Sequence, residues 1–200
     1  MTSDMKRVCV YCGSRAGTDP RFAAKAAEFG RRLAREQLTL VYGGGNVGLM
    51  GVLADAALAN GGEVIGVIPR QLVQWEVAHQ GLTRLDVVES MHERKARMFD
   101  LSDAFVALPG GFGTLDEMFE MLTWRQLGFG DKPCALLDVD GFYSPLVGML
   151  DRMVDRGFVP GEHRRDLWHG EDIDTLLRWL RDNQPTIAKA NPAKAREDSR

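Results

Sequence analysis

The 200-residue chain contains little cysteine and no long apolar run. Its three cysteines, at positions 9, 12 and 134, are an odd and sparse set, which excludes a disulfide framework and predicts reduced thiols in a cytoplasmic protein. No apolar stretch reaches the roughly 18 residues that a membrane span requires. Residues 1–7 also lack the apolar segment of a signal peptide. We therefore expect neither a membrane span nor a signal for export.

A basic surface and a metal-ligand pattern are missing as well. The formal net charge is -3, whereas a dedicated nucleic-acid-binding domain is usually basic. The four histidines have no metal-ligand spacing. Cys9 and Cys12 have CxxC spacing but lie in one apolar segment, where a strand would point their side chains to opposite faces. We expect no nucleic-acid partner and no bound metal.

Short apolar segments alternate with longer amphipathic ones along most of the chain. The apolar segments are rich in Val, Leu and Ile, as in strands covered on both faces, and lie at 7–12, 39–42, 63–68, 86–89, 104–108 and 134–138. The amphipathic segments predict helices at 22–36, 49–60, 92–101, 115–127, 144–156 and 173–181.

This alternation defines the expected fold class. Strands that alternate with helices form a parallel sheet with right-handed crossovers and helices on both faces. We predict a single α/β domain over residues 1–182, with a Rossmann-like, doubly wound sheet. Residues 183–200 are polar and contain two prolines, which is typical of a loose tail.

The most informative segment, residues 107–117, reads ALPGGFGTLDE. It follows a predicted strand and opens a predicted helix. Glycines 110, 111 and 113 with Thr114 let backbone N–H groups converge without obstruction by Cβ atoms, and the helix adds the positive end of its dipole. The segment therefore predicts a phosphate site. Asp116 and Glu117 are expected in the first helical turn, beside the bound anion.

A purely structural interpretation of the same residues remains open. Thr114 and Glu117 have the T-x-x-E spacing of a capping box, in which Glu117 would only tie down the start of the helix. The neighbouring glycines favour a ligand site over this alternative. Arg94, Lys95 and Arg97 have a similar ambiguity: they form either a solvated helix face or a contact for phosphate or carboxylate groups.

Other unusual segments follow other predicted strands, at residues 13–15, 43–48 and 90–95. Ligands of open parallel sheets bind beyond the carboxyl ends of the strands, so these segments should meet on one rim. Residues 43–48 also satisfy G-x-G-x-x-G, the dinucleotide-binding pattern, but they follow the second strand and lack the expected acidic partner. We favour close packing and a pocket wall for these glycines over an NAD site.

Residues 109–117 resemble the P-G-G-x-G-T-x-x-E signature of the LOG ("lonely guy") family, with Asp116 in place of a common Glu. Members are cytokinin riboside 5'-monophosphate phosphoribohydrolases, often described as possible lysine decarboxylases. Residues 8–14, 42–45, 48–51 and 90–95 extend the resemblance, which covers about residues 7–180. The family implies hydrolysis of the N-glycosidic bond of a nucleoside 5'-monophosphate, with free base and ribose 5-phosphate as products, and a homodimer.

The resemblance also implies roles for particular residues. Glu117 and Arg94 would be catalytic, and Glu76 would hold the ribose hydroxyls. Nucleotide contacts would come from Lys95, Gly111, Phe112, Gly113, Thr114 and Thr123. With the loop residues that the strand ends predict, the substrate-binding set is completed by Gly13, Ser14, Gly44, Gly45, Leu115 and Asp116.

Elementary chemistry agrees with this activity. Cleavage of a ribosyl C–N bond develops positive charge on the sugar, which a carboxylate near C1' stabilises while it orients the attacking water. No cofactor is required. Arg94 can pair with the phosphate or polarise the leaving base, and both options stay open. A decarboxylase would need a Schiff-base lysine for pyridoxal phosphate, which Lys95 fits poorly; a non-catalytic nucleotide or cofactor carrier is the stronger alternative.

Overall fold

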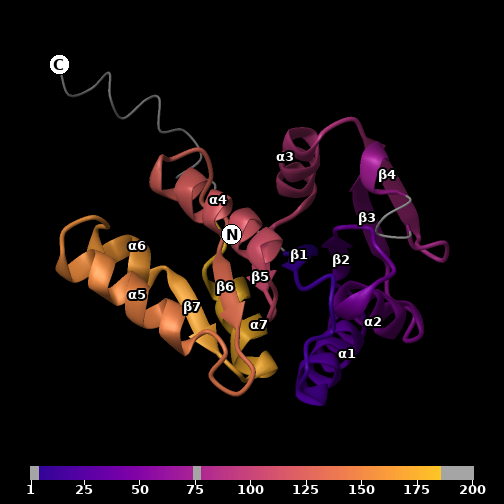
Figure 1. Ribbon diagram of the computed structural model, residues 1–200, viewed down its shortest axis with the longest axis horizontal. Helices are drawn as coiled ribbons and strands as arrows, with labels where there is room; N and C mark the ends of the chain where they lie inside the picture. The colour runs from indigo at the N-terminus through magenta and orange to yellow at the C-terminus, as the bar shows by residue number, and fades with distance from the viewer. Residues whose placement is uncertain (1–4, 74–77, 186–200) are drawn as a thin grey trace.

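The computed structural model describes residues 5–73 and 78–185, which form a seven-stranded parallel sheet with helices on both faces (Figure 1). The strand order is β4-β3-β2-β1-β5-β6-β7. The strands are β1 (Arg7–Tyr11), β2 (Thr39–Tyr42), β3 (Val64–Pro69), β4 (Arg84–Val88), β5 (Ala104–Ala107), β6 (Cys134–Leu137) and β7 (Leu167–Gly170). The helices are α1 (Pro20–Arg35), α2 (Gly48–Leu58), α3 (Met91–Leu101), α4 (Phe112–Gln126), α5 (Ser144–Asp155), α6 (Gly161–Arg165) and α7 (Ile173–Asp182), with a 3-10 turn, η1 (Arg70–Leu72).

Two apolar layers sandwich the sheet, which confirms the predicted α/β fold class. One layer packs side chains of α1, α2 and α7 against one face, and the other packs α3, α4 and α5 against the opposite face. Cys9 belongs to one layer and Cys12 to the other, as the strand alternation predicted. All three cysteines are free and buried, and burial raises the pKa of the Cys134 thiol to about 12.

The structure corrects several predicted boundaries. β7 and α6 were not predicted, because the edge strand β7 has four residues and α6 has five, and such short segments show no clear periodicity. β4 begins at Arg84, earlier than expected. α4 begins at Phe112 instead of residue 115, because the glycine at 113 conceals the start of the helix in the sequence.

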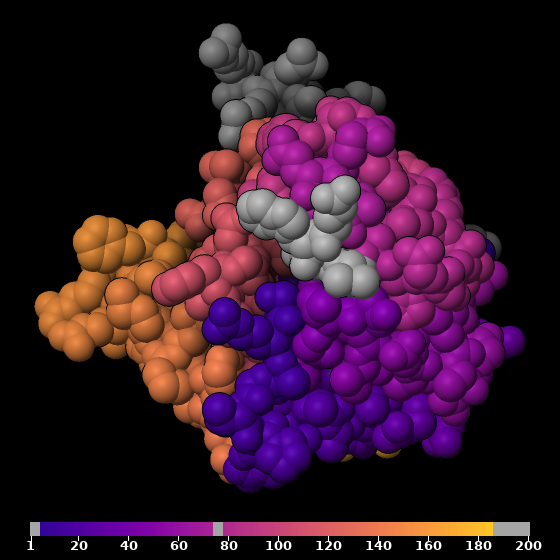
Figure 2. Space-filling view, turned by 45° about the vertical axis from the view of Figure 1, so that its right-hand side comes forward, coloured from indigo at the N-terminus to yellow at the C-terminus, as the bar shows by residue number. Residues whose placement is uncertain are grey.

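The sheet reverses its strand order between β1 and β5, which is the topological switch point of a doubly wound fold. The chain leaves β1 toward α1 on one face and leaves β5 toward α4 on the other. A crevice therefore opens between the two segments that follow these strands. Figure 2 shows the indigo segment that follows β1 beside the salmon segment that begins α4.

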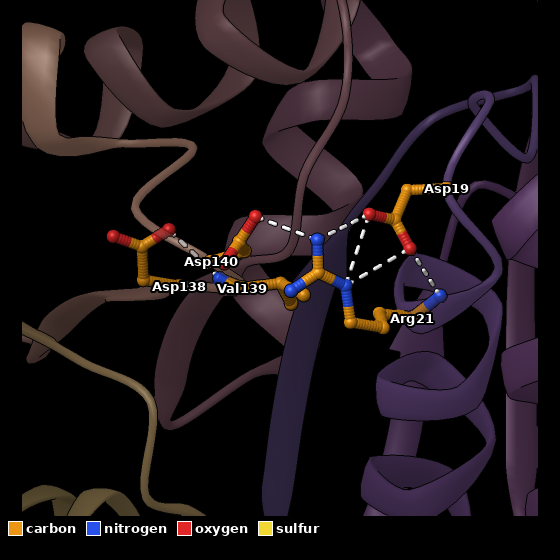
Figure 3. Close-up of polar contacts among 5 residues, drawn as sticks. All are labelled: Asp19, Arg21, Asp138, Val139 and Asp140. Atoms are coloured by element: carbon orange, nitrogen blue, oxygen red, sulfur yellow. Dashed lines mark hydrogen bonds and ion pairs between the residues drawn. The ribbon is translucent and has the colours of Figure 1, made fainter.

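Ion pairs at the rim join α1 to the segment after β6 (Figure 3). Arg21 bridges Asp19 and Asp140, with Nη2 at 2.6 Å from an oxygen of each carboxylate. Asp19 also caps α1 by accepting a hydrogen bond from the backbone N–H of Arg21, and hydrogen bonds from Arg21 lower the pKa of this carboxyl. These groups are exposed, so the ion pairs contribute little to the free energy of folding. Their main effect is to fix the position of α1 relative to the segment after β6.

At the C-terminal end, α7 finishes at Asp182, and Gln184 is buried with its amide donating to the carbonyl of Leu180. The rest of the predicted tail, residues 186–200, lies outside the described residues. None of the described helices is both long and apolar enough to cross a membrane.

Candidate active site

The amino terminus of α4 forms an open cluster of backbone amides at the switch point. Gly111 is the N-cap and makes no side-chain capping bond, so the first amides of the helix point outward without an intrahelical acceptor. A Cβ atom added at Gly111 or Gly113 would meet no atom within 4 Å, so space is open beside them. The helix dipole adds positive potential at this end. The geometry suits a phosphate or another anion.

The loop before α4 is closely packed against the segment after β1. The backbone N–H of Gly13 donates to the carbonyl of Pro109 at 3.1 Å, and the N–H of Leu49 donates to the carbonyl of Gly13 at 3.0 Å. A Cβ atom at Gly110 would collide with the Thr114 side chain and lie 2.9 Å from the nitrogen of Gly13. Glycine is thus required at position 110, because neighbouring atoms leave no room for a side chain, whereas position 113 has that room.

This contrast predicts opposite effects of two alanine substitutions. Gly110→Ala should lower the free energy of unfolding by about 1–3 kcal/mol, because the new methyl group overpacks the loop. Gly113→Ala should leave the free energy of unfolding unchanged or raise it by up to about 1 kcal/mol, because alanine is the better helix former. Urea unfolding of both variants measures the difference, and equal stabilities would contradict the packing seen at Gly110.

A carboxylate and a guanidinium face each other one turn deeper in the crevice. Glu117 on α4 and Arg94 on α3 are 8% and 5% exposed. The Arg94 Nε lies 3.9 Å from the Glu117 Oε1. Nη2 of Arg94 donates to the carbonyl of Gly43 at 3.2 Å. The glycine-rich turn after β2, residues 43–48, is the second glycine turn of the site, and it thus helps to hold the guanidinium. The pair places a buried carboxylate in the same cavity as the amides at the start of α4.

The capping-box interpretation of Glu117 is wrong. The helix begins at Phe112, so Thr114 lies inside its first turn and cannot be its N-cap. Glu117 consequently lies in the second turn, one turn beyond the predicted position. Thr114 is buried instead, with its hydroxyl directed at Gly110.

One cavity extends from the backbone amides at the start of α4, called the anion cluster, to the buried pair of Glu117 and Arg94. Its volume is about 240 Å³. It contains predicted site residues from the segments after β1 and β5 and from α3, together with four residues that were not predicted as contacts. The lining residues are Cys12, Gly13, Ser14, Met50, Leu72, Met91, Arg94, Gly111, Phe112, Gly113, Thr114, Asp116 and Glu117. Of these four, Cys12, Met50 and Met91 lie in segments of the family resemblance but were not assigned as contacts, and Leu72 carries no local signal.

A second cavity of about 340 Å³ adjoins the first and shares Gly13, Ser14 and Gly111 with it. Its other walls include the aromatic pair Phe22 and Phe142. Phe112 stands at the rim of the first cavity with 94% of its surface exposed, a large apolar side chain open to solvent beside the anion cluster.

Three predicted contacts on α3 and α4 do not line this cavity. Lys95 forms ion pairs with Glu120 at 2.8 Å and Asp116 at 3.3 Å, and the hydrogen bond to Glu120 raises the pKa of its ammonium group. Leu115 packs into the apolar layer under α4. Thr123 lies further along α4, where its hydroxyl donates to the Phe119 carbonyl at 2.7 Å, and it lines a different cavity against α5 and α6.

The second glycine turn shows the close packing that was expected of it. Gly44 has a φ of +78°, and a Cβ atom there would lie 3.1 Å from Leu85 and 3.2 Å from Ile68. Gly45 forms an isolated antiparallel bridge with Ala78. Neither lines the cavity, so the pocket wall and the substrate contacts expected of these two glycines are not seen. The predicted ribose contact, Glu76, lies outside the described residues.

Fold and site together define a class of protein. An open amide cluster at the switch point has the geometry that suits an anion, and a buried carboxylate one turn away faces the same cavity. These features are typical of enzymes that act on phosphorylated sugars or nucleotides in a Rossmann-like fold.

Comparison with known proteins gives the family. The family model described as "Possible lysine decarboxylase" matches residues 50–179. The chain is 43% identical to the cytokinin riboside 5'-monophosphate phosphoribohydrolase LOG7 of Arabidopsis thaliana, over 92% of this chain and 84% of that protein. It is 46% identical to the enzyme of the same name from Rhodococcoides fascians, over 88% of this chain and 89% of that protein. The chain belongs to the LOG family.

Solved structures show the same fold at lower identity. The molybdenum cofactor binding protein of Rippkaea orientalis superimposes with a TM-score of 0.68 at 21% identity, over 90% of this chain and 98% of that one. The molybdenum cofactor carrier protein of Chlamydomonas reinhardtii gives a TM-score of 0.67 at 21% identity, with the same coverage. At this identity the likeness concerns the fold alone.

Proposed function

We propose that the chain hydrolyses the N-glycosidic bond of cytokinin riboside 5'-monophosphates or AMP-type nucleotides, releasing the free base and ribose 5-phosphate. The observation that carries this proposal is the shared cavity, in which the buried Glu117–Arg94 pair and the open amides of α4 face the same space. The named relatives supply the substrate class, since the matched proteins are phosphoribohydrolases.

The geometry supports a direct hydrolytic mechanism. The amides of Phe112, Gly113 and Thr114 bind the 5'-phosphate and so place the ribose over the second turn of α4. The bond between C1' and the base nitrogen breaks, and both electrons leave with the base. Glu117 stabilises the positive charge that develops on the sugar and accepts a proton from the water that attacks C1'. The departing base nitrogen takes up one proton from solvent, and Glu117 returns the proton from the attacking water to solvent, so that atoms and charges balance.

Arg94 supports Glu117 in this mechanism. Its guanidinium lies beside the carboxylate rather than at the first amides of α4. In this position it balances the charge of Glu117 and orients it toward C1'. We therefore assign Arg94 to the sugar and leaving-group end of the substrate, with the phosphate held by the helix amides.

The decarboxylase description of the family model fits the site poorly. A Schiff base requires an unprotonated lysine amine. Lys95 is held as an ammonium group by two carboxylates, which raise its pKa. A carrier function for this chain would use the same fold and the same anion cluster. A carrier, however, has no need of a buried carboxylate beside the sugar position.

Product analysis separates the enzyme from the carrier. The purified protein is incubated with AMP and with an N6-prenylated adenosine 5'-monophosphate, and free base and ribose 5-phosphate are quantified. We expect both products in equal amounts over many turnovers. Binding of the nucleotide by calorimetry without release of base would instead support a carrier.

We further propose that the protein is a cytoplasmic homodimer. The cavity between α4 and α5–α6, of about 240 Å³, is largely apolar and includes Phe119, Leu122 and Met153. Apolar side chains at the nearby surface remain exposed, namely Leu127, Phe129, Met149 and Phe158. A two-fold axis near α4 would cover them and could direct Thr123 toward the site of the partner.

The dimer proposal predicts a specific loss of association. Leu122→Glu places a charge in the apolar cavity and should convert a dimeric protein into a monomer, because an unpaired charge is costly to bury. Light scattering coupled to size exclusion measures the mass, and Glu162→Gln on the exposed surface of α6 is the control. A fully active wild-type monomer would contradict the proposal.

A further inference from the structure

A buried histidine outside the cavity joins three segments around the second glycine turn. His79 is 8% exposed, and its backbone N–H donates to the carbonyl of Gly44 at 3.0 Å. The preceding residue, Ala78, pairs with Gly45 in the antiparallel bridge. The stretch around His79 is therefore bonded along the turn that follows β2.

The imidazole is held at both nitrogens. Nδ1 accepts a hydrogen bond from the backbone N–H of Gly81 at 3.0 Å, so the proton resides on Nε2. Nε2 then donates to Asp55 on α2 at 2.9 Å. Gly81 also leaves little room, since a Cβ atom there would lie 3.2 Å from the ring. The ring consequently has one orientation and cannot rotate without loss of both bonds.

The turn that His79 fixes is the one that holds Arg94. The Gly43 carbonyl accepts the hydrogen bond from Nη2 of Arg94, and a Cβ atom at Gly43 would collide with the same guanidinium. Gly44 follows directly and is bonded to His79. A continuous series of contacts thus runs from Asp55 through His79 and the glycine turn to Arg94 and Glu117.

We propose that His79 is a positioning residue: its ring fixes the Gly43–Gly45 turn and so sets the place of the Arg94 guanidinium beside Glu117. This inference rests on the proposed function for the chemistry of Arg94, but the contacts that connect the two residues do not depend on it. A displacement of about 1 Å in a reacting group can reduce turnover up to about a hundredfold.

The test is a double-mutant cycle between His79 and Arg94. His79→Ala should reduce kcat about tenfold or more in the wild-type background. In the Arg94→Lys background the same change should cost less than about threefold, because the shorter lysine no longer depends on the turn. Equal losses in the two backgrounds would overturn the proposal.

Controls separate positioning from general stability. Nε2 of His169 on β7 lies 2.7 Å from Oδ2 of Asp138 in a similar histidine–carboxylate pair remote from Arg94, so His169→Ala should combine additively with Arg94→Lys. His79→Gln keeps a donor of similar reach to Asp55 and should recover part of the lost turnover. If His79→Ala does not fold, Asp55→Ala replaces it; Asp55 is 67% exposed at its side chain, and a several-fold loss of kcat is expected.

A second readout works without catalysis. The same cycle is measured on the affinity for AMP by calorimetry, where we expect coupling of the same sign. If the wild-type protein releases no base but the affinities are coupled, the proposed function fails and the positioning role stands. Additive effects on both kcat and affinity would overturn the positioning role alone.

Discussion

Glu117→Gln should reduce base release at least about a hundredfold while the protein remains folded. The amide keeps the size of the side chain but cannot stabilise a developing positive charge or accept a proton from water, and loss of a positioned acid or base costs this much. The Arg94 hydrogen bond to Gly43 remains. We therefore expect the free energy of unfolding to fall by no more than about 1–3 kcal/mol, the cost of leaving one buried polar partner unsatisfied.

Glu120→Gln is the matched control, because Glu120 lies one turn along the same helix and is also ion-paired, with Lys95. It should retain base release within about threefold of wild type. Nucleotide affinity should persist in Glu117→Gln, since the amides of α4 are untouched. A stable Glu117→Gln protein with undiminished release of base would end the catalytic assignment of this residue.

The structure also clarifies what the sequence could reveal. Residues 107–117 were informative because their chemistry is local: the glycines, the strand before them and the helix after them are neighbours in sequence. The parallel sheet then placed the segments after β1 and β5 on one rim, as the strand alternation predicted. Both inferences follow from periodicity and from the topology of doubly wound sheets.

Other features depend on contacts that no local pattern encodes. The hydrogen bond between Arg94 and Gly43 joins residues 51 positions apart. The helical position of Glu117 depends on α4 beginning at Phe112. Because glycine is a poor helix former, Gly113 indicated a helix that begins later in the sequence. Lys95 and Arg94 are adjacent in sequence, yet helical geometry turns one toward Glu120 and the other into the cavity. His79 gave no signal at all, because its partners lie on α2 and in two turns.

The 5'-phosphate should be required for rapid turnover. With equal concentrations of enzyme, kcat/KM for AMP should exceed that for adenosine by at least about a hundredfold, because binding energy at the phosphate is used to place C1' against Glu117. The open amides of Gly111–Thr114 and the dipole of α4 supply this binding energy. Release of adenine is followed from both substrates at low and at saturating concentration.

Inorganic phosphite distinguishes anchoring from simple recognition. An anion bound at the α4 amides should order the site even when it is not attached to the substrate. Phosphite at millimolar concentration should therefore raise the rate with adenosine several-fold and should compete with AMP. Gly113→Ala adds a methyl group where the cavity is open and leaves the fold intact, so it should reduce the advantage of AMP over adenosine while the rate with adenosine stays the same. Equal kcat/KM values for AMP and adenosine in the wild-type protein would show that α4 does not bind the phosphate, and the assignment of the amide cluster would be wrong.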